Sequence, residues 1–246
     1  MPSFALILPA AGASRRFRDR HYKKPFVPLG DRAVWLHAAE KFLARNDIAQ
    51  SFIVVANDDL EWFREKFAAN LMILGIQVVR GGATRCESVA KALAHVRDDV
   101  EYVCVHDAAR PVVSELWLDE LFAAAEKTGA AIPACPVTQT LKRVGNDHRI
   151  EATVPRDGLW QAQTPQVFRR ELLQQAYANR PNDQATDDAA LVEQLGHPIT
   201  VVRGSALNIK ITTREDLKIA GAMIKLLPKP KLDRDRHPFA EDDLWR

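Results

Sequence analysis

The sequence lacks long hydrophobic runs, paired cysteines and an excess of charge of either sign, and each absence excludes a class of protein. No apolar run approaches the roughly 20 residues that a membrane-spanning helix needs. The three cysteines stand far apart without a CxxC pair, which argues against a disulfide framework and a cysteine-rich zinc site. The 34 Lys and Arg nearly balance the 32 Asp and Glu, whereas a general nucleic-acid binder carries a stronger basic excess. We therefore expect a cytoplasmic globular protein that binds neither membrane nor nucleic acid.

Short runs rich in Val, Ile and Phe alternate with longer amphipathic stretches along the 246 residues. This alternation predicts a mostly parallel sheet, covered by helices on both faces and joined by right-handed crossovers. The expected strands are residues 4–8, 51–55, 76–80, 102–106, 130–134, 199–203 and 208–211. The expected helices are residues 34–45, 58–69, 85–96, 115–127, 169–178, 187–195 and 214–227. The fold class is a doubly wound α/β domain over residues 1–227, followed by a charged tail over residues 228–246.

Residues 136–163 interrupt the alternation. Two β-prone segments, 140–144 and 149–154, flank Gly145-Asn146-Asp147, and this pattern predicts a hairpin. A hairpin has little core of its own and needs a surface to lie against. The segment is either a surface flap or an arm that pairs two subunits, and we favour the arm.

The loop after the first expected strand carries the strongest functional signal. It reads PAAGASRRF over residues 9–17, and its small residues allow backbone N–H groups to approach a phosphate chain. Ligands of open α/β sheets bind outside the carboxyl ends of the strands, where this loop should lie. Between Arg15 and Lys24 the chain has six Lys or Arg and one Asp. A solvated loop can carry such charges, but the preceding small residues favour an anion site, although the GxGxxG fingerprint and the P-loop motif are absent.

Two further strand ends carry candidate residues. Asp107 in VHDAARP is placed to hold Mg²⁺ against a substrate phosphate, although a cap of a helix or turn explains it equally well. Its neighbour Arg110 has the planar fork that grips phosphates, whereas His106 is interpreted as a structural residue. The Gly81-Gly82 pair permits close backbone contact with a flat ligand such as a base.

No Ser/His/Asp, Cys/His or HExxH arrangement is present in the sequence. The predicted site therefore consists of cations, backbone amides and one carboxylate. Phosphoryl or nucleotidyl transfer needs little more, because its catalysis is mainly positioning and charge neutralisation.

Seven motifs extend this interpretation: AAGASRRF, GGATRCESV, VHDAARP, TLKR, VPRDGLWQAQTPQVF, TDDAALVE and NIKIT. In this order they resemble the 2-C-methyl-D-erythritol 4-phosphate cytidylyltransferases, and the resemblance covers residues 4–227. It implies a Rossmann-like fold with a protruding β-arm, here residues 136–163, that pairs two subunits into a homodimer. It also implies an enzyme that condenses CTP with methylerythritol phosphate, with a divalent cation such as Mg²⁺, in non-mevalonate isoprenoid biosynthesis.

The resemblance assigns roles position by position. The catalytic cations are Arg16, Lys24 and Lys210, with Lys23 as the alternative to Lys24. Nucleotide contacts fall on Ala10, Ala11, Gly12, Gly82, Ala83 and Ser88. Contacts with the sugar phosphate fall on Asp107, Arg110, Thr140, Arg156, Thr164 and Thr186, with Asp107 also the metal ligand and the arm residues Thr140 and Arg156 serving the partner's site. Ala83 and Leu207 stand where the family often has acidic residues.

Two alternatives remain. A ribitol 5-phosphate cytidylyltransferase is similar throughout, although HDAARP and GLWQAQTP favour the methylerythritol group. A non-catalytic nucleotide-binding protein of the same fold is the other, and loss of Arg16, Lys24, Asp107 or Lys210 would have indicated it. All four residues are present.

Overall fold

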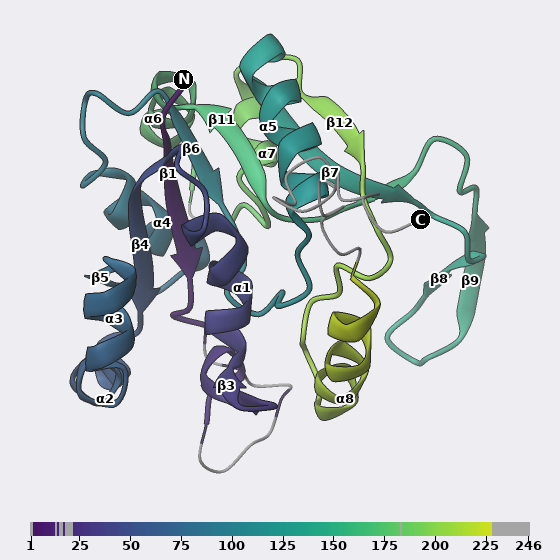
Figure 1. The fold of residues 1–246 in the computed structure, drawn as a ribbon. Helices are drawn as coiled ribbons and strands as arrows, with labels where there is room; N and C mark the ends of the chain where they lie inside the picture. Colours follow the sequence, from purple (N-terminus) through teal and green to yellow (C-terminus); the bar gives the residue numbers. More distant parts are fainter. Residues whose placement is uncertain (1, 13, 15–16, 18–21, 183, 228–246) are drawn as a thin grey trace, which may run out of the picture.

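The computed structural model describes residues 2–12, 14, 17, 22–182 and 184–227. An eight-stranded sheet lies at the centre of the fold (Figure 1). Its strands are β1 (Phe4–Pro9), β4 (Ile48–Val55), β5 (Gln77–Arg80), β6 (Tyr102–Val105), β7 (Ala130–Pro136), β10 (Trp160–Ala162), β11 (Gln166–Arg169) and β12 (Thr200–Arg203). They are ordered β10-β7-β11-β6-β1-β4-β5, and β12 pairs with β7. The pairs β1–β4, β1–β6, β4–β5 and β7–β12 are parallel, whereas β10 and β11 run antiparallel to their neighbours.

Helices cover both faces of this sheet, as the sequence predicts. They are α1 (Val34–Leu43), α2 (Leu60–Lys66), α3 (Ala68–Leu74), α4 (Arg85–Leu93), α5 (Glu115–Thr128), α6 (Arg170–Ala178), α7 (Ala189–Gln194) and α8 (Arg214–Met223). The short elements are η1 (Lys24–Phe26), η2 (Asn57–Asp59), η3 (Ile224–Leu226), β2 (Pro28–Leu29) and β3 (Arg32–Ala33).

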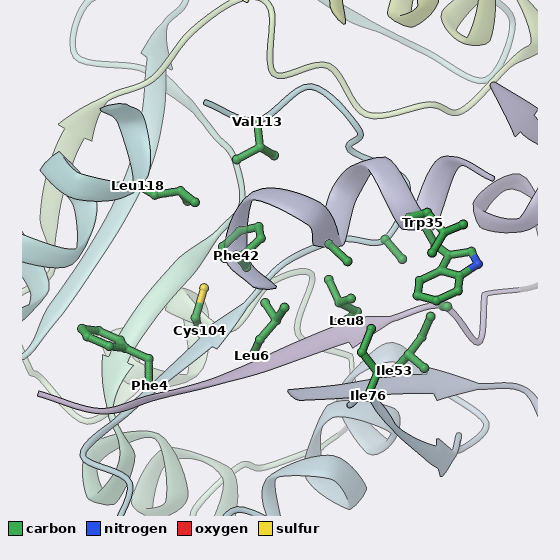
Figure 2. Close-up of a cluster of buried hydrophobic side chains, with 14 of the residues drawn as sticks. Phe4, Leu6, Leu8, Trp35, Phe42, Ile53, Ile76, Cys104, Val113 and Leu118 are labelled. Atoms are coloured by element: carbon green, nitrogen blue, oxygen red, sulfur yellow. The ribbon is translucent and has the colours of Figure 1, made fainter. Parts of the chain in front are cut away.

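The side chains of β1 contribute to a hydrophobic core on each face of the sheet. Because successive strand side chains point to opposite faces, Phe4, Leu6 and Leu8 pack on the side of α1, α2 and α5. Figure 2 shows Leu6 and Leu8 on the side of β1 that faces Trp35 and Phe42 of α1. The intervening residues of β1 pack on the side of α4, α6 and α7. The doubly wound α/β prediction is confirmed.

Two predicted elements differ from the structure, and two strands were not predicted. The helix expected at residues 58–69 is divided, because Phe67 leaves the helical conformation between α2 and α3. The prediction of a strand at residues 208–211 is wrong, because this segment is irregular. Isolated hydrogen bonds hold it instead of a strand ladder, among them those from the Asn208 side chain to Thr164 O and from Ile211 N to Ala109 O. Strands β10 and β11 were not expected at all.

The predicted hairpin is present at one end of the sheet. Strands β8 (Leu141–Val144) and β9 (Ile150–Val154) pair antiparallel as a separate two-stranded sheet. Figure 1 shows the hairpin projecting away from the body of the domain. Its apolar Val144 and Ile150 are exposed in this chain.

Within the described part of the chain, we find no helix with the length and apolar character needed to cross a membrane.

Candidate active site

A cavity of about 230 Å³ opens at the carboxyl ends of β1, β5 and β6. This is the edge at which ligands bind in open α/β sheets. The loops after these three strands line the cavity together with η1 and the segment between β12 and α8. The lining residues are Pro9, Ala10, Ala11, Gly12, Ser14, Lys24, Pro25, Gly82, Ala83, Thr84, Arg85, Ser88, Asp107, Ala109 and Lys210.

The loops after β1 and β5 can meet only because position 81 is a glycine. A Cβ atom there would lie 2.6 Å from the Cβ of Ala11, so no other residue lets the two loops meet this closely. Backbone bonds extend the sheet into both loops, from Ala10 N to Val54 O and from Gly81 N to Val55 O, each 2.8 Å long. The sequence thereby brings two short-side-chain loops together as one wall.

The turn before α4 is braced by side chains of that helix. The hydroxyl of Ser88 accepts a bond from Gly82 N at 3.0 Å and donates to Thr84 O at 2.8 Å. The carboxylate of Glu87 accepts from Ala83 N at 2.8 Å, and Thr84 caps the helix by accepting from Glu87 N. Ser88 therefore fixes the shape of the wall that the base was predicted to contact.

Asp107 lies among three cations at the end of β6. Its Oδ2 atom is 2.8 Å from Lys210 Nζ and 3.5 Å from Arg110 Nε, and its Oδ1 atom is 3.6 Å from Arg85 Nε. Burial opposes ionisation of this carboxyl, yet Lys210, Arg85 and Arg110 together hold the pKa of Asp107 below its ordinary value. The carboxylate is consequently charged at neutral pH.

The backbone that carries Asp107 is fixed from behind. The hydroxyl of Thr164 accepts from Asp107 N at 3.0 Å and lies 3.2 Å from His106 Nδ1, while His106 Nε2 lies 3.0 Å from Arg110 O. Burial lowers the pKa of His106 to about 4, so the ring is neutral. Since Arg110 O can only accept, Nε2 carries the proton and Nδ1 accepts from Thr164. Both ring nitrogens are used, as expected of a structural histidine.

The two adjacent lysines of the first loop have different surroundings. Lys23 Nζ lies 2.6 Å from Asp59 Oδ2 and forms an ion pair with it, and Lys23 does not line the cavity. Lys24 lines the cavity, and its backbone N donates to Ser14 Oγ at 3.1 Å. The geometry therefore favours Lys24 over Lys23 as the loop lysine.

The structure brings together nine of the predicted residues. Those that line the cavity are Ala10, Ala11, Gly12, Lys24, Gly82, Ala83, Ser88, Asp107 and Lys210. Five others do not line it: Thr164 and Arg110 lie behind Asp107, Thr140 and Arg156 lie on the exposed hairpin segment, and Thr186 is exposed before α7. Arg16 lies outside the described residues.

Arg85 is a cavity residue that the sequence analysis did not select. Cations are disfavoured at a helix N-terminus by the helix dipole, and Arg85 is the first residue of α4. That mismatch was visible in the sequence and points to a role other than helix stability. The guanidinium bonds to Asp188 at 2.7 Å, so Asp188 was missed as well.

Comparisons with known proteins agree with this geometry. The model of the family "2-C-methyl-D-erythritol 4-phosphate cytidylyltransferase" matches residues 4–226. The chain belongs to this family. A family member from Rhodopirellula baltica is 43% identical over 90% of this chain and 95% of its own length, and one from Dechloromonas aromatica is 41% identical over 92% and 99%.

Solved structures give the same result for the fold. The cytidylyltransferase of this family from Thermus thermophilus superposes with a TM-score of 0.75 at 32% identity, covering 92% of this chain and all of the other. The Francisella tularensis member has a TM-score of 0.74 at 30% identity, with coverage of 90% and 99%. The Rossmann-like fold expected from the resemblance is confirmed.

Proposed function

We propose that the cavity beside Asp107 is where CTP reacts with 2-C-methyl-D-erythritol 4-phosphate. The products are 4-diphosphocytidyl-2-C-methyl-D-erythritol, a precursor in isoprenoid biosynthesis, and pyrophosphate. Family membership makes the protein a nucleotidyltransferase. The observation that carries the proposed location is the meeting of Lys24, Asp107 and Lys210 in a single cavity with the small-residue loops.

The reaction needs no general base from the protein. An oxygen of the sugar phosphate, already ionised at neutral pH, forms a bond to the α-phosphorus of CTP. The bond between that phosphorus and the bridging oxygen breaks, and pyrophosphate leaves with the electron pair. Because the neutral His106 is occupied on both ring nitrogens, it takes no proton in this scheme.

The cavity residues divide between the base and the phosphates. Residues 10–12 and 82–83 bind the cytosine mainly through their backbone, because a flat base requires walls without bulky side chains. Lys24 and Arg16 neutralise the β- and γ-phosphates as pyrophosphate forms, and Lys210 acts at the α-phosphate. Preorganised charges of this kind stabilise the transition state more than the bound substrate.

A divalent cation fits beside Asp107 when the nucleotide is bound. No group of three or more His, Cys, Asp or Glu residues suited to a metal occurs among the described residues. Among the residues that line the cavity, Asp107 is the one carboxylate, and it is ionised. That matches Mg²⁺, which usually binds through one or two carboxylates, substrate phosphates and water. When bound, Mg²⁺ would neutralise phosphate charge and fix the geometry of the triphosphate. Asp107 is the residue that would hold it.

We also propose that the hairpin forms an arm of a homodimer. Its exposed apolar residues need a covering surface, and a second copy supplies one with two-fold symmetry. Thr140 and Arg156 lie on this segment, away from the cavity of their own chain, and would serve the site of the partner. The three cysteines form no disulfide within the described residues, which supports a cytoplasmic location, since that compartment is reducing.

The experiment that tests the reaction is pyrophosphate release from CTP with Mg²⁺ and a panel of methylerythritol, ribitol and erythritol phosphates. We expect turnover with methylerythritol 4-phosphate and little with the others. Preference for ribitol 5-phosphate would overturn the acceptor while keeping the reaction class. CTP binding without turnover of any acceptor would identify a non-catalytic member of the fold.

A further inference from the structure

Arg85 stands between two buried carboxylates on the wall of the cavity. Its Nη2 atom donates to Asp188 Oδ2 at 2.7 Å, and its Nε atom lies 3.6 Å from Asp107 Oδ1. The side chain of Arg85 is 23% exposed, whereas that of Asp188 is fully buried. The arginine therefore reaches the cavity, and Asp188 reaches only the arginine and its own supports.

Asp188 is held on all sides by elements remote from the cavity. Its Oδ1 atom accepts a bond of 2.6 Å from the hydroxyl of Tyr177 in α6, and its backbone N donates to Gln166 Oε1 in β11 at 3.1 Å. Burial, followed by the charge of Asp188, raises the pKa of Tyr177, so the phenol remains a donor. Both carboxylate oxygens are thus occupied, one by Tyr177 and one by Arg85.

Stability is a weak explanation for this arrangement. Well-packed apolar residues can replace buried ion pairs without loss of stability, and an arginine at the start of a helix opposes the helix dipole. What the pair does provide is one fixed orientation of a guanidinium beside Asp107. Because Asp188 holds Nη2, Arg85 does not close onto Asp107, whose Oδ1 atom remains beyond hydrogen-bond length.

We propose that Asp188, supported by Tyr177, is a positioning residue for the transfer reaction and acts by holding Arg85 at the wall of the cavity. Arg85 supplies a directed positive charge for the triphosphate, and Asp188 sets that direction. The inference rests on the proposed site of the reaction. Wild-type turnover tests the reaction itself, and only the variants below test Asp188.

Two variants separate the electrostatic attraction between Arg85 and CTP from the orientation of the Arg85 side chain. In Asp188→Asn the charge of Arg85 stays in the cavity but loses its fixed orientation. We expect kcat to fall about tenfold or more, while the KM for CTP changes less than about threefold, because misalignment acts on the transition state. In Arg85→Gln both attraction and alignment are lost, so kcat falls and KM for CTP rises.

The decisive measurement is the double variant. If Asp188 acts through Arg85, Asp188→Asn has no further effect on kcat in the Arg85→Gln background. The matched control is Asp47→Asn, which removes the carboxylate from Arg45 at the same 2.7 Å distance but away from the cavity; its kcat should equal that of wild type. All variants are assayed well below their measured melting temperatures.

Tyr177→Phe keeps the test open should Asp188→Asn fail to fold. It removes only the hydroxyl bond to Asp188, and we expect a smaller fall in kcat with the same unchanged KM. The proposal would be overturned if kcat fell less than about threefold in folded Asp188→Asn. It would also be overturned if Asp188→Asn lowered kcat as much in the Arg85→Gln background as in the wild-type background. An effect on KM without an effect on kcat would overturn it too.

Discussion

Lys210 Nζ lies 2.8 Å from Asp107 Oδ2, and this contact joins the segment after β12 to the end of β6. The two residues are far apart in the sequence, and the sheet does not connect them directly. Lys210 is positioned by its neighbours: Arg110 donates to Asn208 O at 2.7 Å, and Ile211 N donates to Ala109 O at 2.8 Å. Both bonds tie the irregular Lys210 segment to the loop that carries Asp107. The contact thus sets a cation and an ionised carboxylate side by side in the cavity.

The first prediction separates the roles of these two residues. Asp107→Asn and Lys210→Met should each reduce kcat about a hundredfold, because a preorganised charge in such a site is worth about 3 kcal/mol of the barrier. Only Asp107→Asn should also raise the Mg²⁺ concentration needed for half-maximal rate, since the neutral amide is a poorer ligand. Titration of the rate with Mg²⁺ measures both effects. An unchanged Mg²⁺ requirement in Asp107→Asn would remove this residue as the metal ligand.

The second prediction uses the adjacent lysines as a matched pair. Lys24→Ala should cut kcat about a hundredfold, because it removes a cavity cation that neutralises the leaving pyrophosphate in the proposed reaction. Lys23→Ala should change kcat by less than about threefold, because Lys23 pairs with Asp59 outside the cavity lining. Steady-state turnover of both variants gives the comparison. The reverse ranking would move the catalytic role to Lys23.

The fold was largely predictable because its core strands are continuous hydrophobic runs. β1 is recognised from its own residues, and the carboxyl-end rule then indicates the three loops that line the cavity. β11 was not predicted, because it is a short segment that forms a strand through its pairing with neighbouring strands. It pairs antiparallel with both β6 and β7. For residues 208–211 the opposite error occurred: the apolar Ile211 is buried and Ile209 is partly buried, although the segment has no partner strand.

Sequence-based prediction of the candidate site has the same limit, because some of its residues depend on contacts between distant elements. Lys24, Asp107 and Lys210 lie in motifs with a recognisable chemical character, so the sequence selects them. Asp188 has no such signal, because its significance depends on contacts with Arg85 and Tyr177 from distant elements. Sequence patterns indicate which residues face a ligand more readily than which residues hold those in place.

The third prediction concerns pH and stability. His106 is buried, and burial lowers its pKa to about 4, against about 6.5 in an unfolded chain. Between these values the unfolded state binds a proton that the folded state does not, so the free energy of unfolding falls as pH falls from 6.5 towards 4 and is unaffected above 6.5. The slope from this residue approaches about 1.4 kcal/mol per pH unit.

His106→Gln isolates this contribution. Chemical denaturation of wild type and variant across pH 4 to 8 gives the difference in unfolding free energy, in which the titration of all other groups cancels. The difference should be constant above pH 6.5 and should shift in favour of the variant at lower pH. A difference that does not vary with pH would mean that His106 has the same pKa in the folded protein as in the unfolded chain.

The last prediction tests the shared site. Asp107→Ala removes a cavity residue, and Arg156→Ala removes a residue of the segment between β9 and β10, where its guanidinium now bonds to Thr138 O. Its fork is suited to two charge-assisted bonds with a substrate phosphate. If the arm of one subunit completes the cavity of the other, each homodimer is inactive. A mixed dimer, however, contains one cavity in which both residues are intact.

To test this arrangement, subunits of the two variants are exchanged, the heterodimer is isolated with two affinity tags, and its turnover is compared with that of both parents. We expect about half of the wild-type activity per dimer, because one of two sites is restored. If both parents are inactive and the isolated heterodimers are equally inactive, Arg156 does not serve the cavity of the partner subunit.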